Sequence, residues 1–423
     1  MASSKYAAQQ LVRLMIFAVM SVSGSADNLE DVFKNGKVSG QLRAFWYDGE
    51  RDLRIDRTAL TVGGILSYQT APISGLNGGI SFFSSNGALP VTRMPYSGQT
   101  HNLNLDGSSI NTLGEAYLQY KAGETSIKFG RQRLDLPLAN DYYNRMLPNS
   151  FEALYSENRS MKNTVFKASY ITGWKYKADD TFRSPTYTLG IDRDIAVLGA
   201  VYAPEPSFKL ELYDTYVRDV MNAPYVQIID NSIWKSSEGI TFSGALQYLS
   251  ENSIGLHAAG ETNTYLLGVR GTVSKGAWSL SALYTQIGDQ SLLGTGGRYE
   301  KMGWGGFITY TDLQIDGESE NAAAKAYGSI LVYRPLSNFE VSAKYVRINQ
   351  NDSKQSNSAS LTLNPRPDSD EYNIDATYQP RKEFRIRTRL ARINYDSSST
   401  ELYQNKAYDE TNVRIIADYL FSI

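Results

Sequence analysis

Hydrophobic residues occupy every second position over the last eleven positions of the chain, and Arg414, Ile416, Asp418, Leu420 and Ser422 lie between them. The apolar row consists of Val413, Ile415, Ala417, Tyr419, Phe421 and Ile423. Side chains of a β-strand point alternately to its two faces, so this period of two predicts a strand with one apolar face. An apolar row that contains an aromatic residue near a C-terminus is typical of the closing strand of an outer-membrane β-barrel.

The same alternation recurs along the chain in segments of about ten residues, the length that a tilted strand needs to cross the hydrocarbon layer. Counted back from the C-terminus, the pattern predicts strands near residues 37–47, 57–69, 77–85, 112–121, 125–131, 150–159, 163–173, 195–203, 207–218, 223–234, 238–250, 263–273, 277–286, 325–334, 338–348, 371–379, 383–395 and 411–423. We therefore expect an all-β fold, a transmembrane antiparallel up-and-down barrel of about 18 strands.

The connections between these segments alternate between tight turns and long polar loops. This is the arrangement of short periplasmic turns and longer extracellular loops in outer-membrane barrels. Residues 303–312 also alternate, but an additional strand there would leave the two termini on opposite sides of the membrane. We therefore place residues 303–312 inside a long folded loop.

The N-terminus has the pattern of a secretory signal peptide. Lys5 and Arg13 precede the apolar run 14–22, which is followed by small residues up to Ala26. We expect cleavage after Ala26, which leaves residues 27–423 as the barrel domain. The alternative is a retained helical anchor, but the run is shorter than the ~20 apolar residues that a spanning helix needs. No later stretch is apolar enough to cross a bilayer as a helix, so a membrane-spanning form must be a closed barrel.

Composition narrows the class of protein. The chain has 30 tyrosines and 34 glycines against 13 prolines, and tyrosine is typical of the interfacial girdles of a barrel. A secreted β-sandwich or β-helix is the alternative with similar composition.

The net charge of −2 argues against a nucleic-acid partner. Without cysteine there is no disulfide framework, thiolate metal site or thiol nucleophile, and two histidines without a motif argue against an enzyme. No cofactor or metal is expected; the acidic residues at 48–56 match no calcium motif.

Arg385, Arg387 and Arg389 form a row on one face of a predicted strand whose other face is apolar. In lipid each arginine would cost roughly 2–4 kcal/mol near the bilayer centre, so the row must face the lumen. Side chains on one strand face repeat about every 7 Å, which makes the row a candidate basic ladder for carboxylates. The alternative is a row neutralised by lumen acids such as Asp375.

Two neighbouring strands extend this basic wall. Arg414 on the last strand and Arg43 on the first strand also point inward by alternation, as do Arg270 and Lys344 farther away. When the barrel closes, the first strand and the last two become adjacent. The ladder and Arg414 and Arg43 would then share one sector of the lumen. Taken singly, each of these residues is more typical of a generic lumen charge than of a binding residue.

The predicted loop at residues 132–149 is rich in apolar and aromatic side chains, which need a surface to pack on. Folded into the barrel, this loop would form a constriction in which Asp135 and Asp141 present negative charge opposite the basic wall. Such a transverse field orients dipolar solutes. The alternative is a loop packed on the outer rim.

Three short motifs within this region resemble the third-loop region of OprD-type outer-membrane porins. They are Gly130-Arg131-Gln132, Leu136-Pro137-Leu138-Ala139-Asn140-Asp141, and Arg145-Met146-Leu147-Pro148-Asn149-Ser150-Phe151-Glu152-Ala153. The resemblance adds Arg131 and Arg145 to Asp135 and Asp141 as candidate constriction residues. It also implies that the arginine row serves as that family's basic ladder.

Two further regions resemble the same group. The run Trp278-Ser279-Leu280-Ser281-Ala282-Leu283-Tyr284, then Gly288-Asp289 and Thr309-Tyr310-Thr311-Asp312, is similar to that family's seventh-loop region. Residues 33–40 are similar to the first strand of related porins and major outer-membrane proteins. The chain departs from the pattern at its end, where Ile423 replaces the usual aromatic residue and Phe421 lies two positions inside.

The sequence therefore predicts a porin in the outer membrane of a Gram-negative bacterium. It would pass small hydrophilic solutes down their gradients, with carboxylate-bearing solutes favoured by the ladder. The alternative is a plugged surface barrel that acts as an adhesin or structural protein, which would need neither an inward loop nor an opposing basic wall. Expected partners are the solutes and outer-membrane lipid and lipopolysaccharide, and both a monomer and a homotrimer fit the sequence.

Overall fold

The computed structural model describes residues 26–52, 56–88, 100–289, 304–306, 309–315, 322–350, 367–396 and 407–423. A single antiparallel sheet contains every strand of these residues. These residues form 18 strands behind a helix, α2 (Ala26–Lys34). The strands are β1 (Lys37–Arg51), β2 (Arg57–Gln69), β3 (Leu76–Gly87), β4 (Ile110–Ala122), β5 (Thr125–Gln132), β6 (Ser150–Asn158), β7 (Thr164–Lys175), β8 (Ile195–Glu205), β9 (Phe208–Val217), β10 (Met221–Lys235), β11 (Ile240–Ser253), β12 (Asn263–Lys275), β13 (Trp278–Ile287), β14 (Lys325–Leu336), β15 (Phe339–Asn349), β16 (Ser369–Arg381), β17 (Phe384–Tyr395) and β18 (Tyr408–Ser422). Among the described residues, no helix is both long and apolar enough to cross a membrane.

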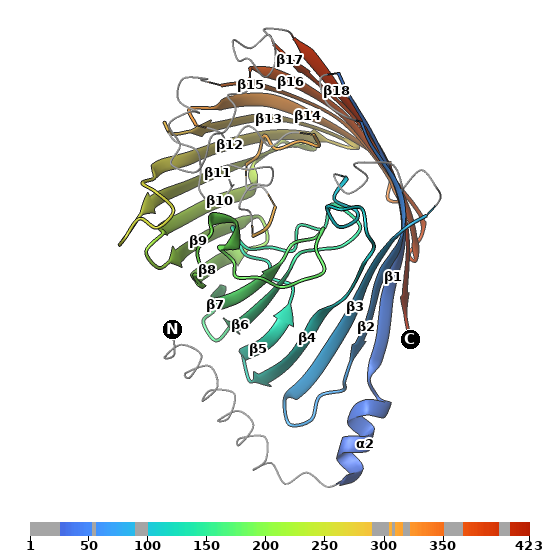
Figure 1. Ribbon diagram of the computed structural model, residues 1–423. Coiled ribbons are helices and arrows are strands. Elements are labelled where there is room, and N and C mark those ends of the chain that lie inside the picture. The colour runs from blue at the N-terminus through green and yellow to red at the C-terminus, as the bar shows by residue number, and fades with distance from the viewer. Residues whose placement is uncertain are drawn as a thin grey trace.

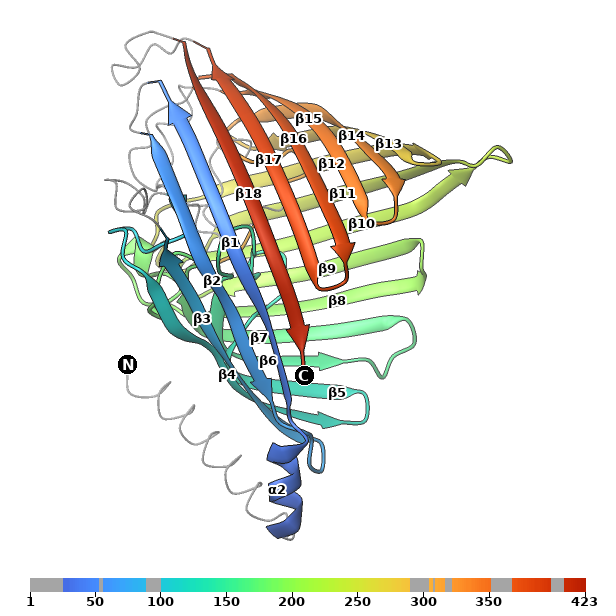
Figure 2. The same ribbon diagram turned by 90° about the vertical axis from the view of Figure 1, so that its right-hand side faces the viewer.

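The sheet closes on itself. Each strand pairs antiparallel with its neighbours along the chain, and β1 completes the circle by pairing with β18 from Ser39 opposite Ser422 to Arg51 opposite Glu410. Figures 1 and 2 show β1 beside β18 along the whole length of this seam. Closure leaves no sheet edge in lipid, where an unpaired backbone group would be costly. The prediction of an antiparallel barrel of about 18 strands is confirmed.

The predicted strand positions agree closely with the structure. For example, β10 spans Met221–Lys235, and the alternation predicted a strand at residues 223–234. Short turns lie at the end of the barrel that carries α2 and the C-terminus (Figure 2). The long connections lie at the other end, where the connection between β9 and β10, residues 218–220, is a short exception. Gly123 and Gly276 lie in two of these turns with φ of +53° and +55°, where a side chain would strain the backbone.

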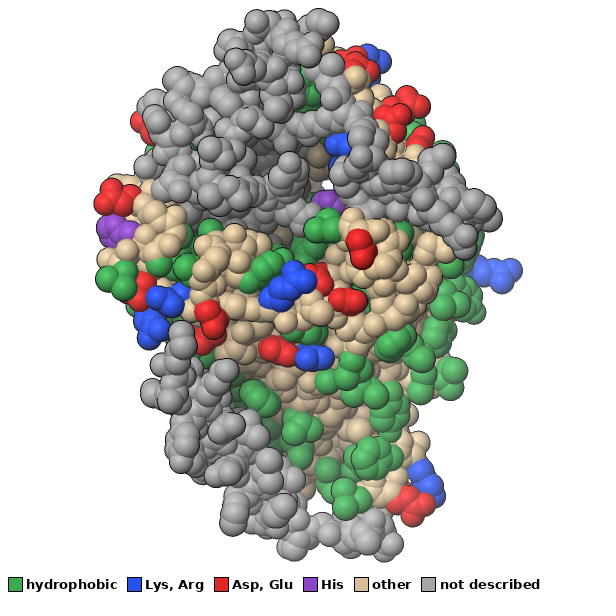
Figure 3. Space-filling model, in the orientation of Figure 1, with side chains coloured by type: hydrophobic (Ala, Val, Ile, Leu, Met, Phe, Trp, Pro, Cys, Tyr) green, Lys and Arg blue, Asp and Glu red, His purple; other side chains and the backbone are tan. Residues whose placement is uncertain are grey.

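Alternation separates the two faces of the wall. On β18 the residues Asn412, Arg414 and Asp418 are buried on the lumen side, whereas Ile415 and Tyr419 are exposed on the outer side. Apolar side chains gather on the outer face in Figure 3, where they cover the strands β2–β4 at the lower right. The apolar row that was read from the last strand therefore points outward, as expected.

The lumen contains loop residues. The described parts of the connection between β13 and β14, Trp304–Gly306 and Thr309–Ile315, form no wall strand, which confirms the placement of 303–312 in a folded loop. Trp304 and Thr311 are each 1% exposed. The predicted signal peptide falls on residues that precede the described ones, except for Ala26, the first residue of α2.

Candidate functional site

The loop between β5 and β6, residues 133–149, folds into the barrel. Its buried apolar side chains are Leu134, Leu136, Leu138, Ala139, Met146 and Leu147. Met146 and Leu147 pack in one cluster with the inward-facing wall residues Phe45 and Phe83. Figure 1 shows teal and green loop segments inside the ring of strands, above β3 and β4 in this view. The expected inward loop is confirmed, and the hydrophobic effect explains it, because these side chains have the wall to pack on.

Polar contacts attach this third loop to the first strand. The Tyr143 hydroxyl donates to Gln41 Oε1 at 3.0 Å, and Arg43 Nη1 donates to the Arg145 carbonyl oxygen. The Arg43 guanidinium also lies over the Tyr143 ring, 4.1 Å from its centroid. Arg145 Nε donates in turn to the carbonyl oxygen of Thr100 in the preceding long connection. The loop is therefore fixed against β1 by both packing and hydrogen bonds.

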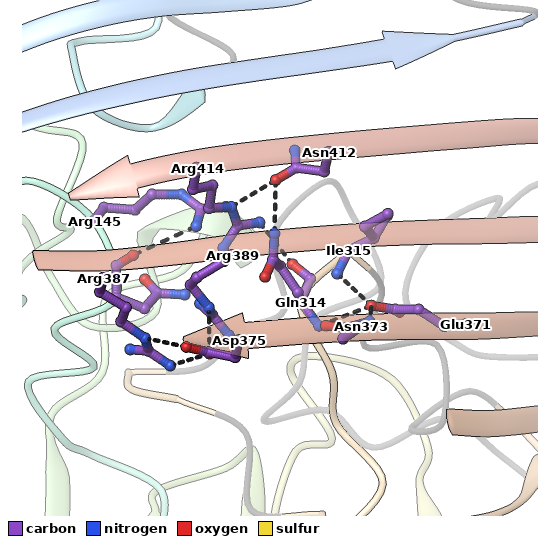
Figure 4. Close-up of polar contacts among 11 residues, drawn as sticks. Arg145, Gln314, Ile315, Glu371, Asn373, Asp375, Arg387, Arg389, Asn412 and Arg414 are labelled. Carbon is purple, nitrogen blue, oxygen red and sulfur yellow. Dashed lines mark hydrogen bonds and ion pairs between the residues drawn. The ribbon is translucent and has the colours of Figure 1, made fainter. Parts of the chain in front are cut away.

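Two aspartates pair with the predicted arginine ladder. Asp418 on β18 accepts from Arg43 Nε at 2.6 Å and from Arg385 Nη2 at 2.6 Å. Asp375 on β16 accepts from Arg387 Nε and from Arg389 Nε, each at 2.8 Å (Figure 4). Asp375 was the acid named in the alternative interpretation, and each of the two carboxylates lies between two guanidiniums.

Exposure divides the arginines into two groups. The side chains of Arg385 and Arg387 are 41% and 37% exposed, so water in the lumen reaches their guanidiniums. Arg389 is 11% exposed and Arg43 only 4%. Arg414 is 1% exposed, and its guanidinium donates to Asn412 Oδ1 and to the Gln314 carbonyl oxygen, each at 2.7 Å. Alternation alone could not separate these groups, because all five point inward.

The candidate constriction residues Arg145, Arg131 and Asp135 have different partners and do not form one cluster. Arg145 joins the arginine wall, where its guanidinium and that of Arg414 lie 5.5 and 5.4 Å from the centroid of the Tyr47 ring. Arg131 instead pairs with Glu152 of β6, with Nε 3.0 Å from Oε1. Asp135 forms an isolated backbone bridge with Asn140, and its carbonyl oxygen accepts from Lys167 Nζ at 3.5 Å.

Asp141 belongs to a mixed-charge group on the β4 side. Arg133 lies between two acids, with Nη1 3.5 Å from Asp141 Oδ2 and Nε 3.7 Å from Glu115 Oε2. Burial raises the pKa of the Asp141 carboxyl above its ordinary value, although the Arg133 charge acts in the opposite direction. Sequence reasoning missed Arg133 and Glu115. The signal was present in the loop motif, where Arg133 continues the spacing of Arg131 beyond the strand.

Two carboxylates of the acidic segment near residues 48–56 accept hydrogen bonds from other groups of the protein. Asp48 accepts from the Thr58 hydroxyl at 2.6 Å, and Asp56 accepts from the Arg51 backbone N–H at 2.9 Å. Over the part of the chain that the structure describes, no three acidic or histidine side chains come together as a metal site would require.

Several solved structures share this fold. Among solved structures, the chain is similar to Pseudomonas aeruginosa OpdK with vanillate (TM-score 0.71, 17% identity, 93% of this chain and 100% of that one). It is also similar to Acinetobacter baumannii OccAB3 (0.74, 14%, 92% and 100%) and to a BenF-like porin from Pseudomonas fluorescens Pf-5 (0.74, 15%, 93% and 100%). At these identities the likeness establishes the fold.

The family follows from the sequence itself. No curated protein sequence matches the chain. Residues 92–423, however, match the profile described as "outer membrane porin, OprD family", which covers more than half of the chain, including the third loop and the connection between β13 and β14. Members of this family are non-enzymatic channels of the Gram-negative outer membrane. The chain belongs to the OprD family of outer-membrane porins.

Proposed function

We propose that this porin lets small hydrophilic solutes diffuse passively and favours solutes that carry a carboxylate. One observation carries the proposal: Arg385 and Arg387 present partly exposed guanidiniums to the lumen from the same strand face. Guanidinium is planar, always charged and shaped to hold a carboxylate with two parallel hydrogen bonds. These two arginines are the groups that meet the solute.

The charge of the wall supports this assignment. The guanidiniums of four arginines (Arg43, Arg385, Arg387 and Arg389) pair with two carboxylates, those of Asp375 and Asp418. The guanidiniums of Arg145 and Arg414 lie near the Tyr47 ring of the same wall and complete the set. Positive charge therefore exceeds negative charge within this set, which raises the local concentration of anions in the lumen. The set is asymmetric around the barrel, because it is built on β1 and β16–β18 and on the third loop.

Transport requires that each site releases the solute again. Arg385 and Arg387 already pair with Asp418 and Asp375, so an entering carboxylate replaces an existing partner and the free energy of the exchange is small. Each carboxylate that the solute replaces is buried but keeps a second arginine, Arg43 for Asp418 and Arg389 for Asp375, so it is not left as an uncompensated buried charge. Conduction needs sites that are weak and repeated, and these two arginines provide both features.

A similar protein supports the class of solute. Pseudomonas aeruginosa OpdK, whose fold this chain shares, has been crystallised with vanillate, an aromatic carboxylate. We extend the carboxylate to this chain because its own lumen carries the matching arginines.

The test compares two solutes in liposomes that contain the purified porin. In the double variant Arg385→Gln/Arg387→Gln, we expect the flux of a small monocarboxylate to fall several-fold and the flux of a neutral sugar of similar size to stay nearly constant. The reversal potential in a salt gradient should shift toward cation selectivity. The matched control is Arg392→Gln, which removes an arginine from the outer face of the same strand.

The remaining outcomes contradict the proposal in distinct ways. Equal loss of both fluxes would show that the two arginines only shape the pore. Unchanged fluxes would place them outside the conduction path. Absence of ohmic conductance in the unmodified protein would favour the plugged surface barrel.

A further inference from the structure

The helix α2 lies at the periplasmic end of the barrel, directly before the first strand. Figures 1 and 2 show it at the lower end of β1, away from the loops inside the barrel. Only Asn35 and Gly36 separate α2 from β1, so the position of the helix is tied to the strand that closes the barrel against β18. The helix itself takes no part in the pore.

The described side chains of α2 divide into two faces. With about 100° of rotation per residue, Leu29, Val32 and Phe33 fall on one side of the helix. The ion pair between Glu30 and Lys34, with Nζ 2.5 Å from Oε1, lies on the other side. Val32 is 9% exposed, whereas Leu29 and Phe33 are 56% and 61% exposed. We call Leu29, Val32 and Phe33 the apolar face of α2, and the chain itself leaves the larger part of this face uncovered.

The barrel holds the last turn of α2. The Val32 carbonyl oxygen accepts from the Ala71 backbone N–H at 2.9 Å, and the Phe33 carbonyl oxygen accepts from the Tyr68 hydroxyl at 2.7 Å. Carbonyls at the end of a helix have no partner within it, so the barrel supplies the partners here. A Cβ at Gly36 would lie 2.5 Å from Tyr68 Cε2, which means that only glycine permits this close contact with the ring.

Tyr68 belongs to the outer face of the wall. The preceding residue, Ser67, faces the lumen, because its hydroxyl lies 2.9 Å from that of Ser81, which donates to the buried carboxylate of Glu115. Alternation along β2 therefore turns Tyr68 outward, on the same side as Leu66, which is 53% exposed. The helix is thus attached to the barrel through the row of side chains that faces the membrane.

The apolar face of α2 continues this membrane-facing surface. Beside Leu66, the outer face carries Leu42 on β1 opposite Tyr419 on β18, at 59% and 49% exposure. In Figure 3 the apolar side chains over β2–β4 extend down toward the end that carries α2. Tyrosines at the end of a barrel wall mark the boundary between acyl chains and headgroups, so Tyr68 places the helix at that boundary.

Charge does not explain an attachment of α2 to a membrane. From residue 29 to residue 34, two carboxylates, those of Glu30 and Asp31, accompany one ammonium group, that of Lys34. Without an excess of positive charge, a helix binds phospholipid through the apolar area that it buries. Leu29 and Phe33 provide this area, and we expect high salt to leave the attachment unchanged.

We infer that α2 is an interfacial helix whose partner is the phospholipid of the periplasmic leaflet of the outer membrane. Leu29 and Phe33 enter the acyl chains, while Glu30, Asp31 and Lys34 stay in water. Phospholipid is the occupant, rather than a second copy of the chain or a periplasmic protein, because the apolar face is continuous with the outer face of the barrel. The helix thereby fixes the beginning of β1 at the membrane surface, a role that is independent of the solute.

The first experiment measures the depth of single labelled positions. Because the chain contains no cysteine, Phe33→Cys and Asp31→Cys each carry one environment-sensitive fluorophore. The labelled porins are reconstituted in phosphatidylcholine vesicles with a nitroxide on the acyl chain, or with iodide on both sides of the membrane. We expect the nitroxide to quench the label at position 33 several-fold more than the label at position 31, and iodide to show the reverse order. Leu66→Cys is the reference for a position in lipid.

Two results of this experiment would overturn the inference. Equal quenching of both labels by iodide would leave the apolar face of α2 in water. Protection of position 33 from iodide without quenching by the nitroxide would place that face against protein, such as a second copy of the chain.

The second experiment needs no label. In vesicles, trypsin should cleave after Lys34 several-fold faster in Leu29→Ser/Phe33→Ser than in the unmodified porin, because the helix leaves the membrane and unwinds. The matched control is Asp31→Ser on the polar face, which should be cleaved at the unmodified rate, and high salt should not accelerate cleavage. Equal rates for the double variant and the control would overturn the inference. The gel shift between unheated and heated samples confirms a folded barrel in each case.

Discussion

The side chain of Arg43 donates from Nε to Oδ1 of Asp418 at 2.6 Å across the seam between the first and the last strands of the barrel. The two residues are directly opposite in the register of β1 and β18, and both side chains are buried, at 4% and 1% exposure. The other oxygen of Asp418 is bound by Arg385 of β17. One carboxylate therefore joins three strands at the point of barrel closure.

Asp418→Asn should destabilise the barrel measurably. Asparagine keeps the shape but leaves two guanidiniums without their shared negative charge, and removal of one partner from a buried pair typically costs about 3–5 kcal/mol. Unfolding in urea, followed by the gel shift of the folded barrel, measures the change. The control is Asp409→Asn, which breaks an exposed pair with Arg392 between β17 and β18 and should cost about 1 kcal/mol or less. Equal effects of both variants would contradict the role of the seam pair.

Asp141 should make ion selectivity depend on pH. Burial raises the pKa of this carboxyl, so it loses its negative charge at a higher pH than an ordinary aspartate as the solution is acidified. Selectivity should then shift toward anions across that interval, because the arginine wall keeps its charge. Reversal potentials measured from neutral to acidic pH test this shift. Asp141→Asn should remove that part of the titration, and an unchanged pH profile in the variant would assign the effect to other groups.

Met146→Ala should loosen the third loop without unfolding the barrel. Met146 is fully buried between the loop and the wall, and truncation of such a side chain typically costs about 2–5 kcal/mol. Because the strands keep their own hydrogen bonds, we expect the loss to appear as increased noise in single-channel recordings. Met161→Ala is the control, since that side chain is 58% exposed in a short turn. Quiet channels from both variants would show that the loop does not depend on this packing.

Phe421→Asp should lower the yield of assembled barrel more than its stability. The ring of Phe421 lies over Gly40 of the first strand, where a Cβ would come within 2.5 Å of its Cζ. Near the membrane interface a charge costs only about 0–1 kcal/mol, so the purified barrel should remain folded. Quantifying the heat-modifiable form in isolated outer membranes measures yield. Ser422→Asp places the same charge one residue away, and we expect it to assemble normally.

The fold was predictable because alternation is a local property. In a barrel, each strand places one row of side chains in lipid and one in the lumen, so the period of two in residues 411–423 or 383–395 directly records both faces. The inward direction of Arg385, Arg387 and Arg389 followed from the cost of placing arginine in lipid. The inward third loop followed from apolar residues such as Leu136 and Met146, which had to find a surface. These conclusions needed only the residues within each segment.

The partners of the arginines were not predictable in the same way. Arg414 and Gln314 are 100 positions apart, and Glu371 and Gln314 are 57 apart, yet these contacts decide which lumen charges meet solutes and which hold a loop. Alternation gives Arg385 and Arg414 the same inward direction and says nothing about what covers them. The sequence by itself determined the closed barrel, its faces and its basic sector, because strand periodicity and the cost of charge in lipid act locally. Only the tertiary structure decided that Arg385 and Arg387 stay exposed while Arg414 is buried, because burial depends on where a distant loop folds within the lumen.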